Sequence, residues 1–235
     1  WWCSLWFREE LKRCNISSKD WSTMVARGSI FLSSSVLLLA SACAAPPKEP
    51  PASAAMAPAA QAAVVAGTRF VVWDHRADKE FEWVVDSVGP DGSVSGTASD
   101  GCSFVLTELG IGPARAWTNC PDDMPQWRSG TNTITGHDGA LFPLAVGNVE
   151  SWSFTSRSST GESGDEKRVC TVAATVRITT RTGERDAFKV LCDSKWHTLT
   201  AYVDADGYPI RDTFEHKQRG VQWDNEVLSI EPPAA

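Results

Sequence analysis

The side chains best suited to covalent chemistry in this chain are its seven cysteines. Two of them, Cys3 and Cys14, lie within the first 23 residues, and Cys43 follows directly on a run of small residues. The other four are Cys102, Cys120, Cys170 and Cys192. This distribution indicates two kinds of cysteine chemistry, a modification at Cys43 and disulfide formation among the last four.

Cys43 ends the stretch "LLLASAC" at residues 37–43. The apolar run from Ile30 to Ala42 is too short for a transmembrane helix, which needs roughly 20 apolar residues. With Arg27 before it and small residues at its end, the run is typical of a secretory signal. Its end resembles a bacterial lipobox, in which the cysteine becomes the lipidated first residue of the mature protein. We therefore predict lipidation of Cys43; cleavage after Ala42 without a lipid is the alternative.

The residues around Cys43 also bear on the membrane that would hold the anchor. The usual lipobox has Leu three places before the cysteine, where this chain has Ala40. In lipoproteins of this kind, an alanine after the cysteine, here Ala44, is not an inner-membrane retention signal. The resemblance therefore implies a cell-envelope protein on the outer membrane, facing the periplasm or the cell surface.

The first 23 residues fit no part of such a signal. Met24 lies where a signal peptide should begin, since the chain continues through Arg27 into the apolar run. We expect translation to start at Met24, so that residues 1–23 are an upstream extension and residues 24–42 are the signal peptide. An amphipathic N-terminal helix is the alternative for residues 1–23.

The four remaining cysteines predict disulfides, because an exported chain enters an oxidising compartment. Four cysteines allow three pairings. We expect Cys102–Cys120 and Cys170–Cys192, each closing a loop of about 20 residues, for which the chain-entropy model gives roughly 3 kcal/mol of stabilisation. A zinc site with four cysteine ligands is the alternative, but the chain has no Cys-x-x-Cys spacing.

Residues that could carry out catalysis follow no known pattern. The histidines show no His-x-His or His-Glu-x-x-His spacing, and Gly-x-Ser-x-Gly and phosphate-binding Gly-rich loops are absent. A Ser/His/Asp triad can come from distant parts of a sequence, but nothing here singles out its nucleophile. We therefore predict no metal, no cofactor and no catalytic residue, and favour a protein that is not an enzyme.

Tryptophans offer a candidate binding surface. Trp117 and Trp127 lie in the loop-like stretch "ARAWTNCPDDMPQWRSG" at residues 114–130, which also holds Cys120. An exposed Trp pair on a loop fixed by a disulfide could stack on sugar rings or bind a partner protein. The alternative is that both rings cap the end of the core. The expected polar neighbours of the pair are Arg115, Asn119 and Arg128.

Composition narrows the range of partners. The formal net charge is −7, and it becomes more negative without residues 1–42, which carry more basic than acidic side chains. An acidic protein without a Lys/Arg cluster is a poor partner for nucleic acid or for an anionic membrane surface. The expected partners are the membrane, through the lipid anchor, and an envelope protein or glycan.

The elements that must position these residues are strands. Residues 43–66 are almost all Ala and Pro and predict an extended tether of about 70 Å, whereas residues 67–232 predict one β-domain. In "EFEWVVDSV" (80–88), Phe81, Trp83 and Val85 alternate with polar residues. Asp-Gly pairs that favour tight turns recur at residues 91, 100, 138 and 206. The pattern predicts an all-β antiparallel meander of about nine to eleven strands, forming a sandwich or a partly open barrel.

Two longer runs predict a hairpin. In "VCTVAATVRIT" (169–179) and "AFKVLCD" (187–193), alternate residues share one face, and that face carries Cys170 in the first run and Cys192 in the second. The turn between them contains Gly183. This arrangement supports a Cys170–Cys192 bridge.

Three stretches of the C-terminal half resemble a family of uncharacterised bacterial envelope lipoproteins. In that family a Pro-Leu-x-Val-Gly-Asn segment opens a strand and is followed by a paired-strand unit shaped like Gly-x-Phe-x-x-x-Lys-Val. Here Gly183 and "AFKV" take that role, with residues 184–186 inserted. The stretches span about 75 residues: "LFPLAVGNVESWSF", "RVCTVAATVRITTRTGERDAFKVLC" and "LTAYVDADGYPIRDTF". The resemblance implies an envelope protein with structural β units and transfers no catalytic residue.

Three functions are consistent with these features. The first is a lipid-anchored envelope protein whose β-domain binds a partner or takes part in envelope assembly without catalysis. The second is a carrier of a lipid or other apolar ligand, and the third is an envelope hydrolase with an unrecognised site. A large apolar cavity would favour the carrier, and a cleft with converging His and carboxylate groups would favour the enzyme.

Overall fold

The computed structural model describes residues 49–122 and 124–233. The predicted upstream extension (1–23), the signal peptide (24–42) and the lipidation site Cys43 lie outside the described residues. Among those described, no helix has the length and apolar character needed to cross a bilayer.

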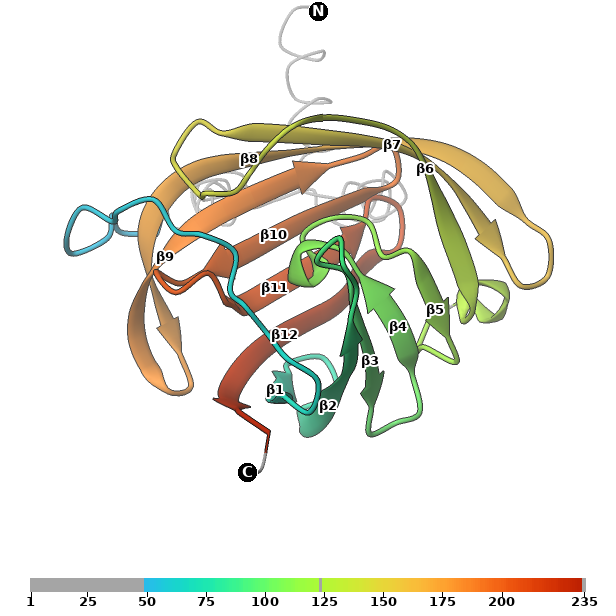
Figure 1. Ribbon diagram of the computed structural model, residues 1–235, viewed down its shortest axis with the longest axis horizontal. Coiled ribbons are helices and arrows are strands. Elements are labelled where there is room, and N and C mark those ends of the chain that lie inside the picture. The colour runs from blue at the N-terminus through green and yellow to red at the C-terminus, as the bar shows by residue number, and fades with distance from the viewer. Residues whose placement is uncertain (1–48, 123, 234–235) are drawn as a thin grey trace, which may run out of the picture. The chain divides into compact units, whose positions relative to one another are not determined.

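The described chain forms twelve strands and two short 3-10 turns (Figure 1). In chain order these are β1 (Arg69–Asp74), β2 (Lys79–Val88), β3 (Val94–Ala98), β4 (Ser103–Leu106), η1 (Glu108–Gly110), β5 (Ala116–Thr118), η2 (Pro125–Trp127), β6 (Gly130–Gly139), β7 (Val149–Ser158), β8 (Ser163–Thr180), β9 (Gly183–Asp193), β10 (His197–Val203), β11 (Pro209–His216) and β12 (Gly220–Glu231).

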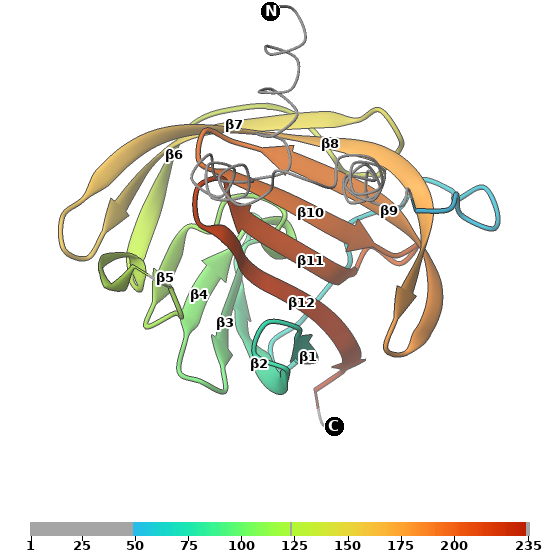
Figure 2. The same ribbon diagram turned by 180° about the vertical axis from the view of Figure 1, so that it is seen from behind.

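Each strand pairs antiparallel with its neighbours in sequence, and β1 also pairs with β12, so the sheet closes into a barrel. The predicted all-β antiparallel fold is confirmed, in its barrel form. Seen from the opposite side, β9 to β12 form a continuous run of adjacent strands (Figure 2). The number of strands exceeds the expected nine to eleven because β4 and β5, with four and three residues, are too short to show an alternating pattern.

The predicted hairpin is β8 and β9, and both predicted disulfides are formed. Cys170 lies directly opposite Cys192, and both side chains are buried in the barrel interior. Ala173 is the extra residue of a bulge, after which the inner and outer faces of β8 exchange. The bulge therefore places Val176 and Ile178 in a small separate cluster with Ala187 and Ile210.

Because successive strands alternate in direction, the turns fall alternately at two ends of the barrel. We call one end the mouth; its turns are residues 75–78, 99–102, 119–129, 159–162, 194–196 and 217–219. We call the other end the base; its turns are residues 89–93, 107–115, 140–148, 181–182 and 204–208.

The barrel interior holds two apolar clusters. The larger includes Trp152, Phe154, Phe188 and Leu199, with both buried cysteines. The smaller centres on Phe70, which stacks on Trp83 with ring centroids 4.0 Å apart. Loop residues from the base complete them: Leu109 joins the smaller cluster, and Ile111, Leu141 and Leu144 join the larger. The base is thus filled by apolar side chains.

Residues 49–66, the described part of the predicted tether, are extended as expected, but they lie against the barrel (Figure 1). We call them the strap. Pro51 forms a bridge to Val176 on the free edge of β8, and Ala59 exchanges two backbone hydrogen bonds with Leu144. Ala59 is 3% exposed. The strap packs although it has few large side chains, because the edge of β8 and the base loops offer it unpaired backbone groups.

The strap also passes close to the β10–β11 turn. Ala62 donates its backbone N–H to Gly207 O, and a Cβ at position 207 would lie 1.9 Å from Ala60 O. Gly207 also has φ +82°, a conformation that other residues rarely adopt. The glycine of this Asp-Gly turn therefore serves both the hairpin and the seating of the strap.

Candidate functional site

The mouth of the barrel holds a pocket of about 280 Å³, which we call the mouth pocket. Its walls come from both ends of the described sequence, because barrel closure brings β1 beside β12. The lining residues are Arg76 from the β1–β2 turn, Pro121, Asp122 and Arg128 from the β5–β6 loop, His197 on β10, Phe214 on β11, and Arg219, Gln222 and Trp223 from the β11–β12 turn and β12.

One wall of the mouth pocket is an aromatic stack. His197 lies over Phe214 with centroids 4.7 Å apart, and Phe214 lies over Trp223 at 4.1 Å, with interplanar angles of 19° and 11°. The strand register causes the stack, since Phe214 is the direct partner of Trp223 and the three residues share the inner face of β10–β12. Trp223 remains 38% exposed, so the stack presents a flat ring surface to the pocket.

Charged side chains also contact the rings of the stack. The Arg168 guanidinium lies 5.9 Å from the Phe214 centroid, and burial lowers the pKa of Arg168 to about 10, an effect that the neighbouring Glu166 opposes. Trp223 Nε1 donates a hydrogen bond to Asp212 Oδ2. Burial raises the pKa of Asp212 to about 7. The rings are therefore fixed by polar contacts as well as by packing.

The rim of the mouth pocket is cationic. Arg219 Nη1 lies 3.4 Å from Asp122 Oδ1, and Arg76 Nη1 donates to Gln222 O. Arg128 is the third guanidinium. The described lining residues thus include three arginines, two of which, Arg76 and Arg219, are already held by partners, although the chain as a whole is acidic.

Two atoms of the mouth pocket are buried without a hydrogen-bond partner among the described residues, Arg219 Nε and His197 Nδ1. His197 Nδ1 lies 3.4 Å from Glu166 Oε1, close enough for an ion pair but without hydrogen-bond geometry. Glu108 Oε2 is the other such atom in the described part of the chain. Buried polar atoms are nearly always paired, so two of them in one pocket indicate a place for a polar ligand.

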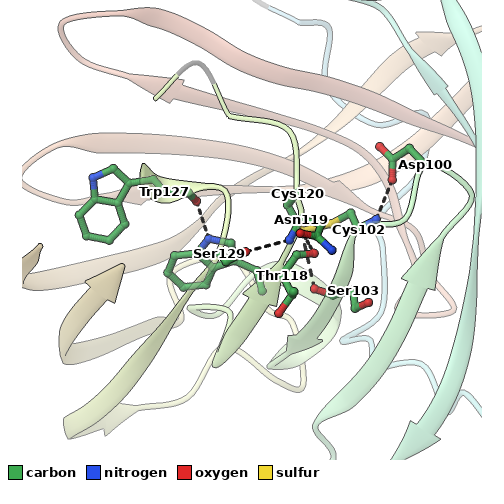
Figure 3. The surroundings of a disulfide bond; sticks show 9 residues. Asp100, Cys102, Ser103, Thr118, Asn119, Cys120, Trp127 and Ser129 are labelled. Atoms are coloured by element: carbon green, nitrogen blue, oxygen red, sulfur yellow. Dashed lines mark hydrogen bonds between the residues drawn. A yellow bond between two sulfur atoms is a disulfide. The ribbon is translucent and has the colours of Figure 1, made fainter. Parts of the chain in front are cut away.

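The disulfide Cys102–Cys120 fixes the wall that carries Arg128 (Figure 3). It joins the β3–β4 turn to the start of the β5–β6 loop. Cys120 then donates its N–H to Arg128 O at 2.8 Å, and Asn119, with φ 57°, donates its N–H to Ser129 Oγ at 3.0 Å. The two ends of the loop are thereby held together, which sets the position of Arg128.

Of the predicted binding residues, the two tryptophans lie together but outside the lining of the mouth pocket. Trp117 and Trp127 are half-buried and stack on each other at 6.4 Å, with Trp117 Nε1 donating to Trp127 O. Trp117 also covers Gly130, where a Cβ would lie 2.5 Å from its ring. Arg115 forms an ion pair with Asp91 at 2.7 Å, and Asn119 is exposed at the loop turn. Arg128 is the one member of the predicted surface that lines the mouth pocket.

No pattern in the sequence indicated that the C-terminal strands contribute residues to the mouth pocket. Phe214 and Trp223 lie on strands whose alternation is visible in "PIRDTFEH" and "GVQWDNEV", but which face is the inner one depends on the pairing of β11 with β12. Arg76 and Arg219 lie in turns 143 residues apart, and no spacing pattern in the sequence relates them. Only barrel closure brings these residues together.

A His–carboxylate pair is present, but its neighbours do not form a triad. Ser194 Oγ donates to Glu166 Oε1 at 3.3 Å, and the same carboxylate oxygen faces His197. The carboxylate stands between the hydroxyl and the imidazole, so the imidazole cannot take the hydroxyl proton as a triad requires. Within residues 49–122 and 124–233, no cluster of three or more His, Cys, Asp or Glu is arranged to hold a metal ion.

Two carboxyl groups, those of the buried Glu150 and the half-buried Glu108, lie near the base, apart from the mouth pocket. Burial and the adjacent Glu150 raise the pKa of Glu108 to about 8. Glu150 is 2% exposed and accepts hydrogen bonds from Leu141 N–H and His137 Nε2. The backbone at Glu108 and Leu109 has φ 49° and 53°, a left-handed turn that is strained for both residues.

No known protein family matches this chain, and no curated protein matches it. Two solved structures are similar in part. A Bacteroides fragilis protein with a YmcC-like fold has a TM-score of 0.39 and 11% identity, covering 74% of this chain and 99% of that one. The hypothetical lipoprotein YmcC from Escherichia coli has a TM-score of 0.43 and 9% identity, covering 72% and 85%. At these values the likenesses assign neither family nor function.

Proposed function

We propose that this protein is a lipid-anchored envelope protein whose barrel binds a saccharide in the mouth pocket without catalysing a reaction. The observation that carries the proposal is the stack of His197, Phe214 and Trp223, which offers a flat aromatic surface beside hydrogen-bonding groups. A sugar ring combines an apolar face with polar edges, and an aromatic face bordered by polar groups is complementary to it.

The size of the mouth pocket favours this function over a carrier of apolar ligands. Its volume of about 280 Å³ lies just below the roughly 300–1,000 Å³ range of small-molecule sites. Such a pocket takes one ring-sized group, and its arginine rim opposes an acyl chain. The larger interior space is filled by the two apolar clusters and the base loops.

An envelope hydrolase is supported less well by the same site. His197 and Glu166 do converge beside the mouth pocket. The nearest hydroxyl, Ser194 Oγ, is bound to the carboxylate and to His197 O, and Ser194 is 4% exposed. A nucleophile held in this way is neither activated by the imidazole nor accessible to a substrate.

The anchor is tested by the intact mass of the native protein extracted from membranes without reduction. We expect a chain that begins at Cys43, carries acyl groups and lacks four hydrogens, one pair for each disulfide. The Cys43→Ser variant should appear in the soluble fraction. A mass that begins after Ala42 without lipid would overturn the anchor, and a mass that includes Trp1 would overturn the signal peptide as well.

Saccharide binding is tested by titrating a panel of neutral and acidic oligosaccharides while following tryptophan fluorescence. We expect Trp223→Ala to weaken binding at least tenfold, because the variant removes the exposed face of the stack. Trp196→Ala is the matched control: Trp196 is 37% exposed, stacks on His216 at 6.4 Å and lies outside the pocket lining. Equal losses in both variants, or no binding by any member of the panel, would contradict the proposal.

A further inference from the structure

The arginine rim extends the proposed function, on which this inference rests, to the chemical class of the saccharide. Arginines gather at the mouth pocket in a chain whose net charge is −7. Guanidinium groups hold carboxylates and phosphates through paired, charge-assisted hydrogen bonds. A neutral sugar has no need of guanidinium groups at its edge, so Arg128 and Arg219 indicate that the ligand is an anion.

The rim is already oriented before a ligand arrives. Arg219 is held through Nη1 by Asp122, which leaves its buried Nε unpaired, and Arg76 is held through Nη1 by Gln222 O. Arg128 extends from a loop that the Cys102–Cys120 disulfide and its backbone hydrogen bonds fix in place. Preoriented donors cost less conformational entropy on binding, which favours affinity for the one ligand geometry they match.

The unpaired atoms locate the anion relative to the ring. Arg219 belongs to the β11–β12 turn at the rim, and His197 forms one end of the aromatic stack. A ligand in the pocket would have its ring on the exposed face of Trp223 and a charged substituent facing the guanidinium groups. Such a ligand pairs Arg219 Nε, a buried donor that otherwise has no hydrogen-bond partner.

We propose that the mouth pocket selects a saccharide bearing a carboxylate or phosphate, with its ring on the Trp223 face and its charge held by Arg128 and Arg219. Uronic acids and sugar phosphates share this chemistry. They differ in charge and shape, and the experiment separates them.

The test compares trigalacturonate with its methyl ester, which has the same rings without the charge, and adds a hexose phosphate as the second anion. By isothermal titration calorimetry at low salt, we expect the acid or the phosphate to bind at least tenfold more tightly than the ester. The difference in affinity between the charged ligand and the ester should decrease as ionic strength rises, because salt screens the guanidinium groups. Whichever anion binds more tightly identifies the source of the charge.

Arg219→Gln and Arg128→Gln should each remove the preference for the charged ligand, so that each variant binds the acid and the ester equally. Arg157→Gln is the control, since Arg157 is exposed on β7, lies outside the pocket lining and gives the same change in net charge. Thermal unfolding of each variant verifies that it is folded. Two separate arginine variants keep the test decisive if one of them fails to fold.

The outcomes separate this inference from the proposed function. Equal binding of acid, phosphate and ester, unchanged in Arg219→Gln and Arg128→Gln, would overturn the selection of an anion and leave saccharide binding standing. Binding of inorganic phosphate without binding of any saccharide would overturn the saccharide class itself. Loss of the preference in Arg157→Gln as well would show a general charge effect and overturn the assignment to the rim.

Discussion

Replacing Cys170 and Cys192 together by alanine should lower the free energy of unfolding by about 3–5 kcal/mol. The two cysteines are 0% and 3% exposed and lie opposite each other on β8 and β9. The variant loses the constraint on the unfolded chain and also leaves space in the larger interior cluster. Urea unfolding of the oxidised wild type and of the variant measures the difference.

The second disulfide supplies the matched control for this prediction. Cys102 and Cys120 are 18 residues apart, against 22 for Cys170 and Cys192, so the loop-entropy contributions differ by only about 0.2 kcal/mol. Cys120 is only half-buried, so we expect the Cys102→Ala, Cys120→Ala variant to lose less stability. If the Cys170–Cys192 variant lost the same free energy of unfolding as the Cys102–Cys120 variant, or less, packing around the interior bridge would add nothing to stability.

Glu108→Gln should make the protein more stable than the wild type at pH 8, by about 4 kcal/mol, and nearly equal to it at pH 4.5. Burial, with the help of Glu150, raises the folded-state pKa of Glu108 to about 8, from 4.5 in the unfolded chain. Between these two values the unfolded chain loses the proton while the folded protein keeps it. Wild-type stability therefore falls as the pH rises through this window, whereas glutamine stays neutral.

Urea unfolding at four pH values between 4.5 and 8.5 measures this effect. The charged or titratable groups around Glu108 are Glu150 and, beyond it, His137; both are kept in the variant. A residual decline that ends near pH 7 is expected from Asp212, whose raised pKa lies there. The exposed Glu80→Gln controls for net charge. Parallel curves for wild type and Glu108→Gln would show that Glu108 is ionised in the folded protein.

The features that the sequence predicted correctly are those with a local signal. Alternation in "VCTVAATVRIT" and "AFKVLCD" located β8 and β9, and the inner positions of that pattern carry the two cysteines that are bridged. The Asp-Gly pairs all fall at strand ends with the glycine at positive φ. Trp83, on the alternating run 80–88, is partly buried against Phe70. Each of these depends on neighbours within about ten residues or on one hairpin.

What escaped prediction depends on barrel closure. Arg76, Arg219 and Trp223 come together only because β1 pairs with β12. The alternation of residues within a strand does not indicate which distant strand it pairs with. Trp117 and Trp127 differ, because they lie ten residues apart and stack on each other locally, with Trp117 also packed on Gly130. The strap escaped prediction because alanine and proline give no apolar pattern, although backbone groups of β8 and the base loops were available to bind it.

The strap also determines how far the domain could stand from a bilayer. Glu49 is held by Lys189 Nζ at 2.6 Å and Tyr202 Oη at 2.7 Å, and the hydrogen bond from Lys189 holds the pKa of Glu49 at about 2. With Cys43 lipidated, six residue steps reach from the anchor to Glu49, at most about 20 Å. The barrel would then stay close to the membrane surface. A force applied through the lipid would act first on the Glu49 ion pair and on the strap contacts with β8, and only then on the mouth pocket.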